Sequence, residues 1–124
     1  MLVRQPDGEW TIGPDPSMTV AELISRSYQG AVDKGWTVKE IPIIEQVALL
    51  HSECSEALES WRNNEPLSWT DNKGKPQGVA SEYADLFIRL GHFIRKEGID
   101  VEYEIRRKWA YNATRPYRHG DKRA

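Results

Sequence analysis

Residues 42–63 read PIIEQVALLHSECSEALESWRN. In this stretch apolar side chains recur every three or four residues, which is the period of an amphipathic helix. Pro42 fits the first turn of such a helix, because the amide hydrogen that proline lacks is not needed there. The stretch therefore predicts a helix from about Pro42 to about Asn63, with one face directed towards a core.

The same period continues on both sides of this stretch. It predicts three more helices: one to about Lys34 with Ser17 or Thr19 as its cap, one from about Gln77 to Lys96, and one from Val101 to about Thr114 capped by Asp100. In the last helix we expect Val101, Ile105 and Trp109 to point inward. Residues 63–78 form a long polar loop, and Pro116 marks the end of regular structure. The fold class is therefore all-α, of the four-helix-bundle type.

The chain has the size of one domain. Residues 1–16 are rich in turn-forming residues, with a hairpin expected around Pro6, Asp7 and Gly8, and residues 17–124 make a single helical domain with a basic tail. Helices in a chain of 124 residues bury a modest core, which favours a homo-oligomer. One cysteine, Cys54, and the absence of a secretory or membrane-spanning run favour a cytoplasmic protein with no membrane partner.

Two acidic pairs interrupt the apolar pattern. Glu53 and Glu56 are three residues apart on one expected helix, and Glu82 and Asp85 are three apart on the next. Residues at this spacing share a helix face, and both pairs lie beside apolar positions, so we expect the four carboxylates to converge. Carboxylates in a partly buried seam repel one another unless a cation compensates, and Mg²⁺ prefers oxygen ligands together with substrate phosphates. The competing interpretation is a solvated acidic helix face.

These residues carry a family resemblance. Residues 49–57, LLHSECSEA, and 78–86, GVASEYADL, are similar to the Glu-x-x-Glu and Glu-x-x-Asp motifs of the MazG-like all-α nucleoside triphosphate pyrophosphohydrolases. The tail over residues 108–122 also resembles the end of that family. One difference is Ser52, where many members have a glutamate, which leaves the number of metal ions open.

The resemblance implies a MazG-like fold completed by a homo-dimer or a dimer-of-dimers tetramer. It implies Mg²⁺, with Mn²⁺ as a substitute, held by Glu53, Glu56, Glu82 and Asp85, and catalytic roles for Glu53 and Glu56. The implied reaction converts a nucleoside triphosphate, a deoxynucleotide or a modified nucleotide, to the monophosphate and pyrophosphate, as housekeeping of the nucleotide pool. Substrate phosphates would be bound by Lys108 and Asn112, with the tail closing over them through Arg115, Arg118, His119 and Lys122.

Aromatic residues and charge leave further alternatives. Trp61, Trp69 and Tyr83 are candidates for stacking on a nucleobase, ahead of Trp36 and Trp109. A binding module that holds a nucleotide or an alarmone without turnover is the main rival to an enzyme. Residues 105–124 contain seven Lys or Arg and one Asp, whereas the whole chain has a net charge of −2. This basic tail suits a metal-bound nucleotide, and a pI of 5.9 argues against a nucleic-acid partner. A purely structural helical bundle would leave the carboxylates unexplained.

Overall fold

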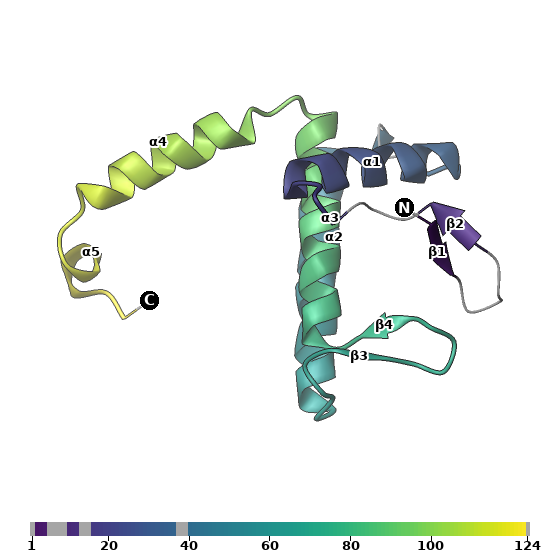
Figure 1. The fold of residues 1–124 in the computed structure, drawn as a ribbon. Coiled ribbons are helices and arrows are strands. Elements are labelled where there is room, and N and C mark those ends of the chain that lie inside the picture. The colour runs from purple at the N-terminus through teal and green to yellow at the C-terminus, as the bar shows by residue number, and fades with distance from the viewer. Residues whose placement is uncertain (1, 5–9, 13–15, 37–39, 124) are drawn as a thin grey trace.

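The computed structural model describes residues 2–4, 10–12, 16–36 and 40–123. The described chain is mostly helical, as predicted, with four short strands (Figure 1). Its elements are β1 (Leu2–Arg4), β2 (Trp10–Ile12), α1 (Val20–Asp33), α2 (Ile43–Arg62), β3 (Trp69–Thr70), β4 (Pro76–Gln77), α3 (Val79–Lys96), α4 (Val101–Ala113) and the one-turn helix α5 (Arg118–Asp121).

The helices begin where the sequence provides capping groups. Thr19 caps α1 through a capping box, in which its hydroxyl accepts a hydrogen bond from the Glu22 amide and Glu22 accepts one from the Thr19 amide. Asp100 caps α4 by accepting a hydrogen bond from the amide of Tyr103. Pro42 is the residue before the first turn of α2. The predicted helix starts at these three places are confirmed.

Helices α2 and α3 run antiparallel and side by side, and α1 crosses them near one end (Figure 1). Gly91 permits the contact between α1 and α3, because a Cβ atom at this position would overlap the side chain of Ile24. The core at this crossing is small. Tyr28 of α1 and Phe93 of α3 are buried there and are surrounded by partly buried apolar residues, Val32, Ile41, Leu49 and Leu50.

The polar segment between α2 and α3 is more regular than predicted. β3 and β4 pair antiparallel, with Trp69 opposite Gln77 and Thr70 opposite Pro76. The Asp71 carboxylate organises the turn by accepting hydrogen bonds from the amides of Lys73 and Lys75 at 2.9 Å. β1 and β2 also form an antiparallel pair, with Leu2 opposite Ile12. The turn predicted at residues 6–8 lies outside the described residues.

Helix α4 differs most from the prediction. It projects away from α1, α2 and α3 (Figure 1), and none of its residues is buried. Ile105 is 58% exposed and Trp109 is 73% exposed, whereas Val101 is half-buried. The predicted inward orientation of Ile105 and Trp109 is therefore wrong within one chain, because none of the described elements covers that face of α4. After Pro116 the chain forms only the four-residue α5, in which Arg118, His119 and Gly120 have positive φ, so the regular helical structure does end near Pro116 as predicted.

Candidate metal centre and adjoining pocket

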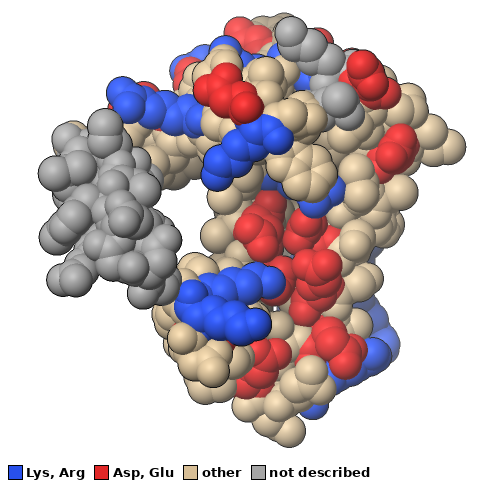
Figure 2. Space-filling model, turned by 90° about the vertical axis from the view of Figure 1, so that its right-hand side faces the viewer, with Lys and Arg blue, Asp and Glu red and all other residues tan. Residues whose placement is uncertain are grey.

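Three of the four predicted carboxylates meet between α2 and α3. One carboxylate oxygen from each of Glu53, Glu82 and Asp85 lies within 4.8 Å of the other two. Glu53 comes from the middle of α2, whereas Glu82 and Asp85 come from the first two turns of α3. The three-residue spacing and the antiparallel packing of the helices bring these oxygens together. Figure 2 shows acidic side chains gathered in a hollow on one face of the molecule.

Burial of these carboxylates costs free energy. Glu53 is only 7% exposed and Glu82 is half-buried, whereas Asp85 is exposed. The Oε2 atoms of Glu53 and Glu82 are buried and have no hydrogen-bond partner. A buried carboxylate oxygen without a partner costs free energy unless a cation or a donor compensates it. Three carboxylates that converge, two of which carry a buried oxygen without a partner, form a donor set that suits a hard divalent cation such as Mg²⁺.

The same surroundings change the proton affinities of the cluster. Burial, followed by contact with Glu56 and by the charges of Glu56, Asp85 and Glu53, raises the pKa of Glu82 to about 7. Burial also raises the pKa of Glu53, although the charge of Arg89 opposes this and those of Glu56 and Asp85 support it. Burial and mutual repulsion thus favour the protonated carboxyls, and a cation bound between them would favour the charged forms instead.

Glu56 has a different place from the other three carboxylates. It is exposed and is not among the three residues whose oxygens converge. Its charge nevertheless acts on both Glu53 and Glu82, so it lies at the edge of the cluster. The prediction that Glu56 is a ligand therefore stays a prediction, and its exposure also leaves it free to meet solvent.

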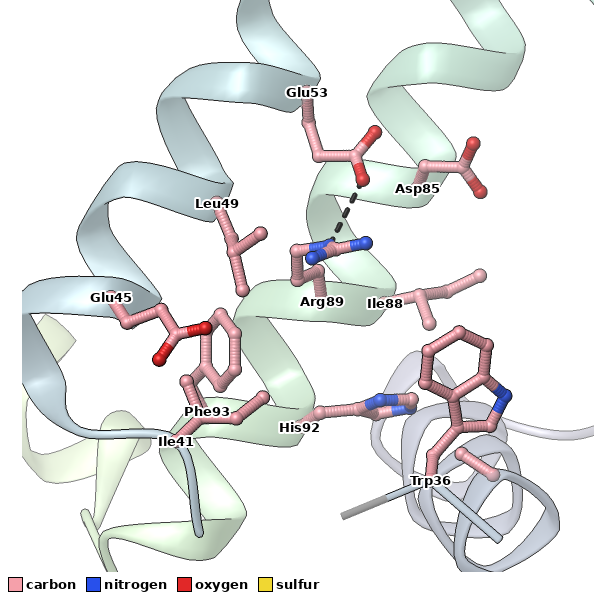
Figure 3. Close-up of a pocket in the computed structure, with 11 residues that line it drawn as sticks. Trp36, Ile41, Glu45, Leu49, Glu53, Asp85, Ile88, Arg89, His92 and Phe93 are labelled. Atoms are coloured by element: carbon pink, nitrogen blue, oxygen red, sulfur yellow. Dashed lines mark ion pairs between the residues drawn. The ribbon is translucent and has the colours of Figure 1, made fainter. Parts of the chain in front are cut away.

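Arg89 is a residue that the sequence did not single out. It follows Asp85 by one turn on α3, and its Nε lies 2.9 Å from Oε1 of Glu53 (Figure 3). The side chain of Glu53 is 9% exposed and that of Arg89 is 37% exposed, so the ion pair is largely shielded on the glutamate side. The pair joins α2 to α3 directly beneath the acidic cluster.

A pocket of about 660 Å³ adjoins the cluster. Glu53, Asp85 and Arg89 belong to its wall, and the rest of the wall is mainly apolar, with Trp36, Leu49 and Phe93 among its members (Figure 3). The volume lies within the range of small-molecule sites, which are mostly apolar with a few polar groups. His92 also lines it, and burial together with the charge of Arg89 lowers the pKa of this imidazole. The pocket therefore has room for a small, largely apolar group beside the carboxylates of Glu53 and Asp85.

The predicted phosphate-binding residues do not join the carboxylates within one chain. They lie on α4 and in the segment after it, which point away from the α2–α3 pair (Figure 1). Lys108 and Asn112 are exposed, one turn apart on α4. The other predicted residues are Arg115, which is half-buried, and Arg118, His119 and Lys122, which are exposed. Several of these cations lie over nearby aromatic rings, such as Arg115 over Tyr111 at 5.8 Å.

The three aromatic residues predicted to stack on a base do not line the pocket. Trp61 is 70% exposed, Tyr83 is exposed, and the indole N–H of Trp69 donates a hydrogen bond to Glu65 at 2.9 Å. Trp36, which the sequence ranked below them, does line it. It follows α1 in a segment without helical period, so spacing gave no signal for its position. Its proximity to the carboxylates depends on how α1 crosses α3.

Comparisons with protein-family models, with curated proteins and with solved structures found no match for this chain. The described helices include none with the length and apolar character that crossing a membrane requires.

Proposed function

We propose that this chain is a magnesium-dependent nucleoside triphosphate pyrophosphohydrolase of the MazG-like type. The observation that supports the proposal is the convergence of Glu53, Glu82 and Asp85, two of which carry a buried unpartnered oxygen. Glu53 and Asp85 also line the adjoining pocket of about 660 Å³. The cation and the pocket match the two halves of a nucleotide, because the phosphates bring negative charge and the base brings a flat apolar group. The substrate is a deoxynucleotide or modified nucleoside triphosphate.

The carboxylates of Glu53, Glu82 and Asp85 would hold Mg²⁺, or Mn²⁺ in its place, with Glu56 at the edge of the same cluster. The bound cation supplies neutralisation of phosphate charge and orientation of the triphosphate. Trp36 is 71% exposed at the pocket, so one face of its indole is free to stack on a base, as aromatic side chains do with nucleobases.

The proposed reaction is attack of water on the α-phosphorus. The bond from the α-phosphorus to the oxygen that bridges to the β-phosphorus breaks, and pyrophosphate leaves with that oxygen. The hydroxyl of the water stays on the nucleoside monophosphate, and its proton passes to a glutamate. We assign this role to Glu56, because it is exposed beside the cluster, whereas Glu53 is buried and paired with Arg89.

The test is release of pyrophosphate from a panel of common and modified triphosphates in the presence of Mg²⁺. We expect turnover by the parent chain and a loss of about 10²–10⁴-fold in kcat for Glu56→Gln, the usual contribution of a general base. Glu59→Gln is the matched control, because Glu59 is an exposed glutamate on the same helix outside the converging set, and it should keep the parent rate. Binding of a nucleotide without turnover would instead support the rival, a non-catalytic nucleotide or alarmone binding module.

We further propose that a second copy of the chain completes the site, in a homo-dimer or a dimer-of-dimers tetramer. Apolar side chains are exposed on α4, such as Ile105 and Trp109, and on the outer sides of α2 and α3, such as Ile44 and Phe87. Packing of α4 from one copy against α2 and α3 of another would cover these apolar side chains. It would also bring the basic residues of that α4, Lys108 among them, towards an acidic cluster of opposite charge.

Mixing two inactive variants tests this arrangement. Lys108→Ala keeps the carboxylates and Glu53→Gln keeps the lysine, so a mixed dimer has one complete site. Refolded together in equal amounts, they should recover about a quarter of the parent activity, since half of the dimers are mixed and one of their two sites is intact. Light scattering should show a particle larger than one chain. A monomeric parent, or a mixture without activity, would remove the second copy from the proposal.

A further inference from the structure

The two carboxylate oxygens of Glu53 have different surroundings, because Arg89 pairs with only one of them. Its Nε lies 2.9 Å from Oε1, whereas Oε2 of the same carboxylate is buried, has no hydrogen-bond partner, and belongs to the residue that converges with Glu82 and Asp85. Glu53 is 7% exposed, so the surrounding protein leaves its side chain little room to change conformation. The carboxylate is therefore held with one oxygen committed to the guanidinium and the other open to a cation.

This division limits what the cluster can bind. In sites with two metal ions about 3.5–4 Å apart, a carboxylate that bridges the ions with one oxygen on each ion needs both oxygens free. Glu53 is the most buried of the three converging carboxylates, and Arg89 already pairs with one of its oxygens. The permanent charge of Arg89 next to it further opposes a second dication, because arginine stays protonated at all working pH values.

We infer that Arg89 is a positioning residue that fixes Glu53 as a one-oxygen ligand and restricts the acidic cluster to a single tightly bound divalent cation. The inference rests on the metal centre of the proposed function, and it adds a stoichiometry that the acidic motifs leave open. Three oxygens within 4.8 Å of one another suit one ion, and the remaining positions around that ion stay available to water and phosphate.

The experiment is a titration of the full chain with Mn²⁺ alone, followed by the electron paramagnetic resonance signal of the free ion. The parent should bind one Mn²⁺ per chain. Arg89→Met removes the charge and frees Oε1 of Glu53, so it should bind two. Arg89→Gln is measured beside it with the same expectation, in case the methionine variant does not fold. Arg106→Met is the matched control, because Arg106 is exposed on α4 and pairs with Glu102 there, and it should bind one.

The outcomes separate the inference from the proposed function. Two ions bound by the parent, or one ion still bound by a folded Arg89→Met or Arg89→Gln, overturns the role of Arg89 while the metal centre stands. No ion bound by a folded parent overturns the metal centre itself. A change in stoichiometry is not a result that a purely structural loss of the ion pair would give, because weakened folding lowers the affinity without adding a site.

Discussion

Without metal, the acidic cluster should make the folded chain less stable as the pH rises. The pKa of Glu82 is about 7 in the folded chain, against an ordinary value of 4.5. The folded state therefore holds the proton more tightly than the unfolded state, so the stabilisation is complete below pH 4.5 and is lost as the pH rises to about 7. At about 1.4 kcal/mol for each pKa unit, the upper limit is about 3 kcal/mol. Because the cluster is open to solvent at Glu56 and Asp85, we expect about 1–2 kcal/mol.

The assay is urea unfolding in a chelating agent, at pH values from 5 to 8, for the parent and for Glu82→Gln. We compare the free energies of unfolding of the two chains at each pH. His92, whose pKa is lowered, makes the free energy of unfolding rise with pH in both chains, so its effect cancels in the difference. The parent should lose about 1–2 kcal/mol relative to the variant across this range. Mg²⁺ at neutral pH should restore the loss in the parent, since a ligand that binds only the folded state stabilises it. A difference that does not change with pH would show that folding does not raise the pKa of Glu82.

Two further predictions concern the packing and the pocket. Gly91→Ala should lower the free energy of unfolding by about 1–3 kcal/mol, because the added Cβ would overlap Ile24. Gly30→Ala, which adds a Cβ in open space on α1, should instead raise the free energy of unfolding by up to about 1 kcal/mol. Equal effects of the two substitutions in chemical denaturation would contradict the packing of α1 on α3. Trp36→Ala should raise KM for the triphosphate at least several-fold and leave Mn²⁺ binding unchanged. Trp61→Ala, outside the pocket, should leave KM unchanged. The opposite pattern in steady-state kinetics would indicate that Trp61, and not Trp36, stacks on the base.

The sequence was most informative where local chemistry decides the structure. Thr19 and Asp100 cap helices through contacts within three residues, so their roles were readable from the chain. The convergence of Glu53 with Glu82 and Asp85 was also predictable, because helical spacing places the second pair on one face and the apolar stripes pack α2 against α3.

The sequence failed where the answer depends on contacts between distant elements. The apolar stripe of α4 indicates that a face needs cover, but it does not say which chain covers it, and Ile105 and Trp109 are exposed. In the sequence, Arg89 resembles any other charged residue on a helix. Its ion pair with Glu53 depends on how α3 packs against α2, which the sequence does not show. Trp36 lines the pocket together with residues of α2 and α3, which lie far from it in the sequence.

The proposed attack of water on the α-phosphorus can be measured by hydrolysis of a triphosphate substrate with Mg²⁺ in water enriched in ¹⁸O, with both products analysed by mass spectrometry. We expect nucleoside monophosphate and pyrophosphate in equal amounts, with the label in the monophosphate and none in the pyrophosphate. The reaction should stop when Mg²⁺ is chelated and in Glu53→Gln. Label in the pyrophosphate would contradict attack at the α-phosphorus, and no turnover of any triphosphate by folded, Mg²⁺-loaded protein would contradict the enzyme itself.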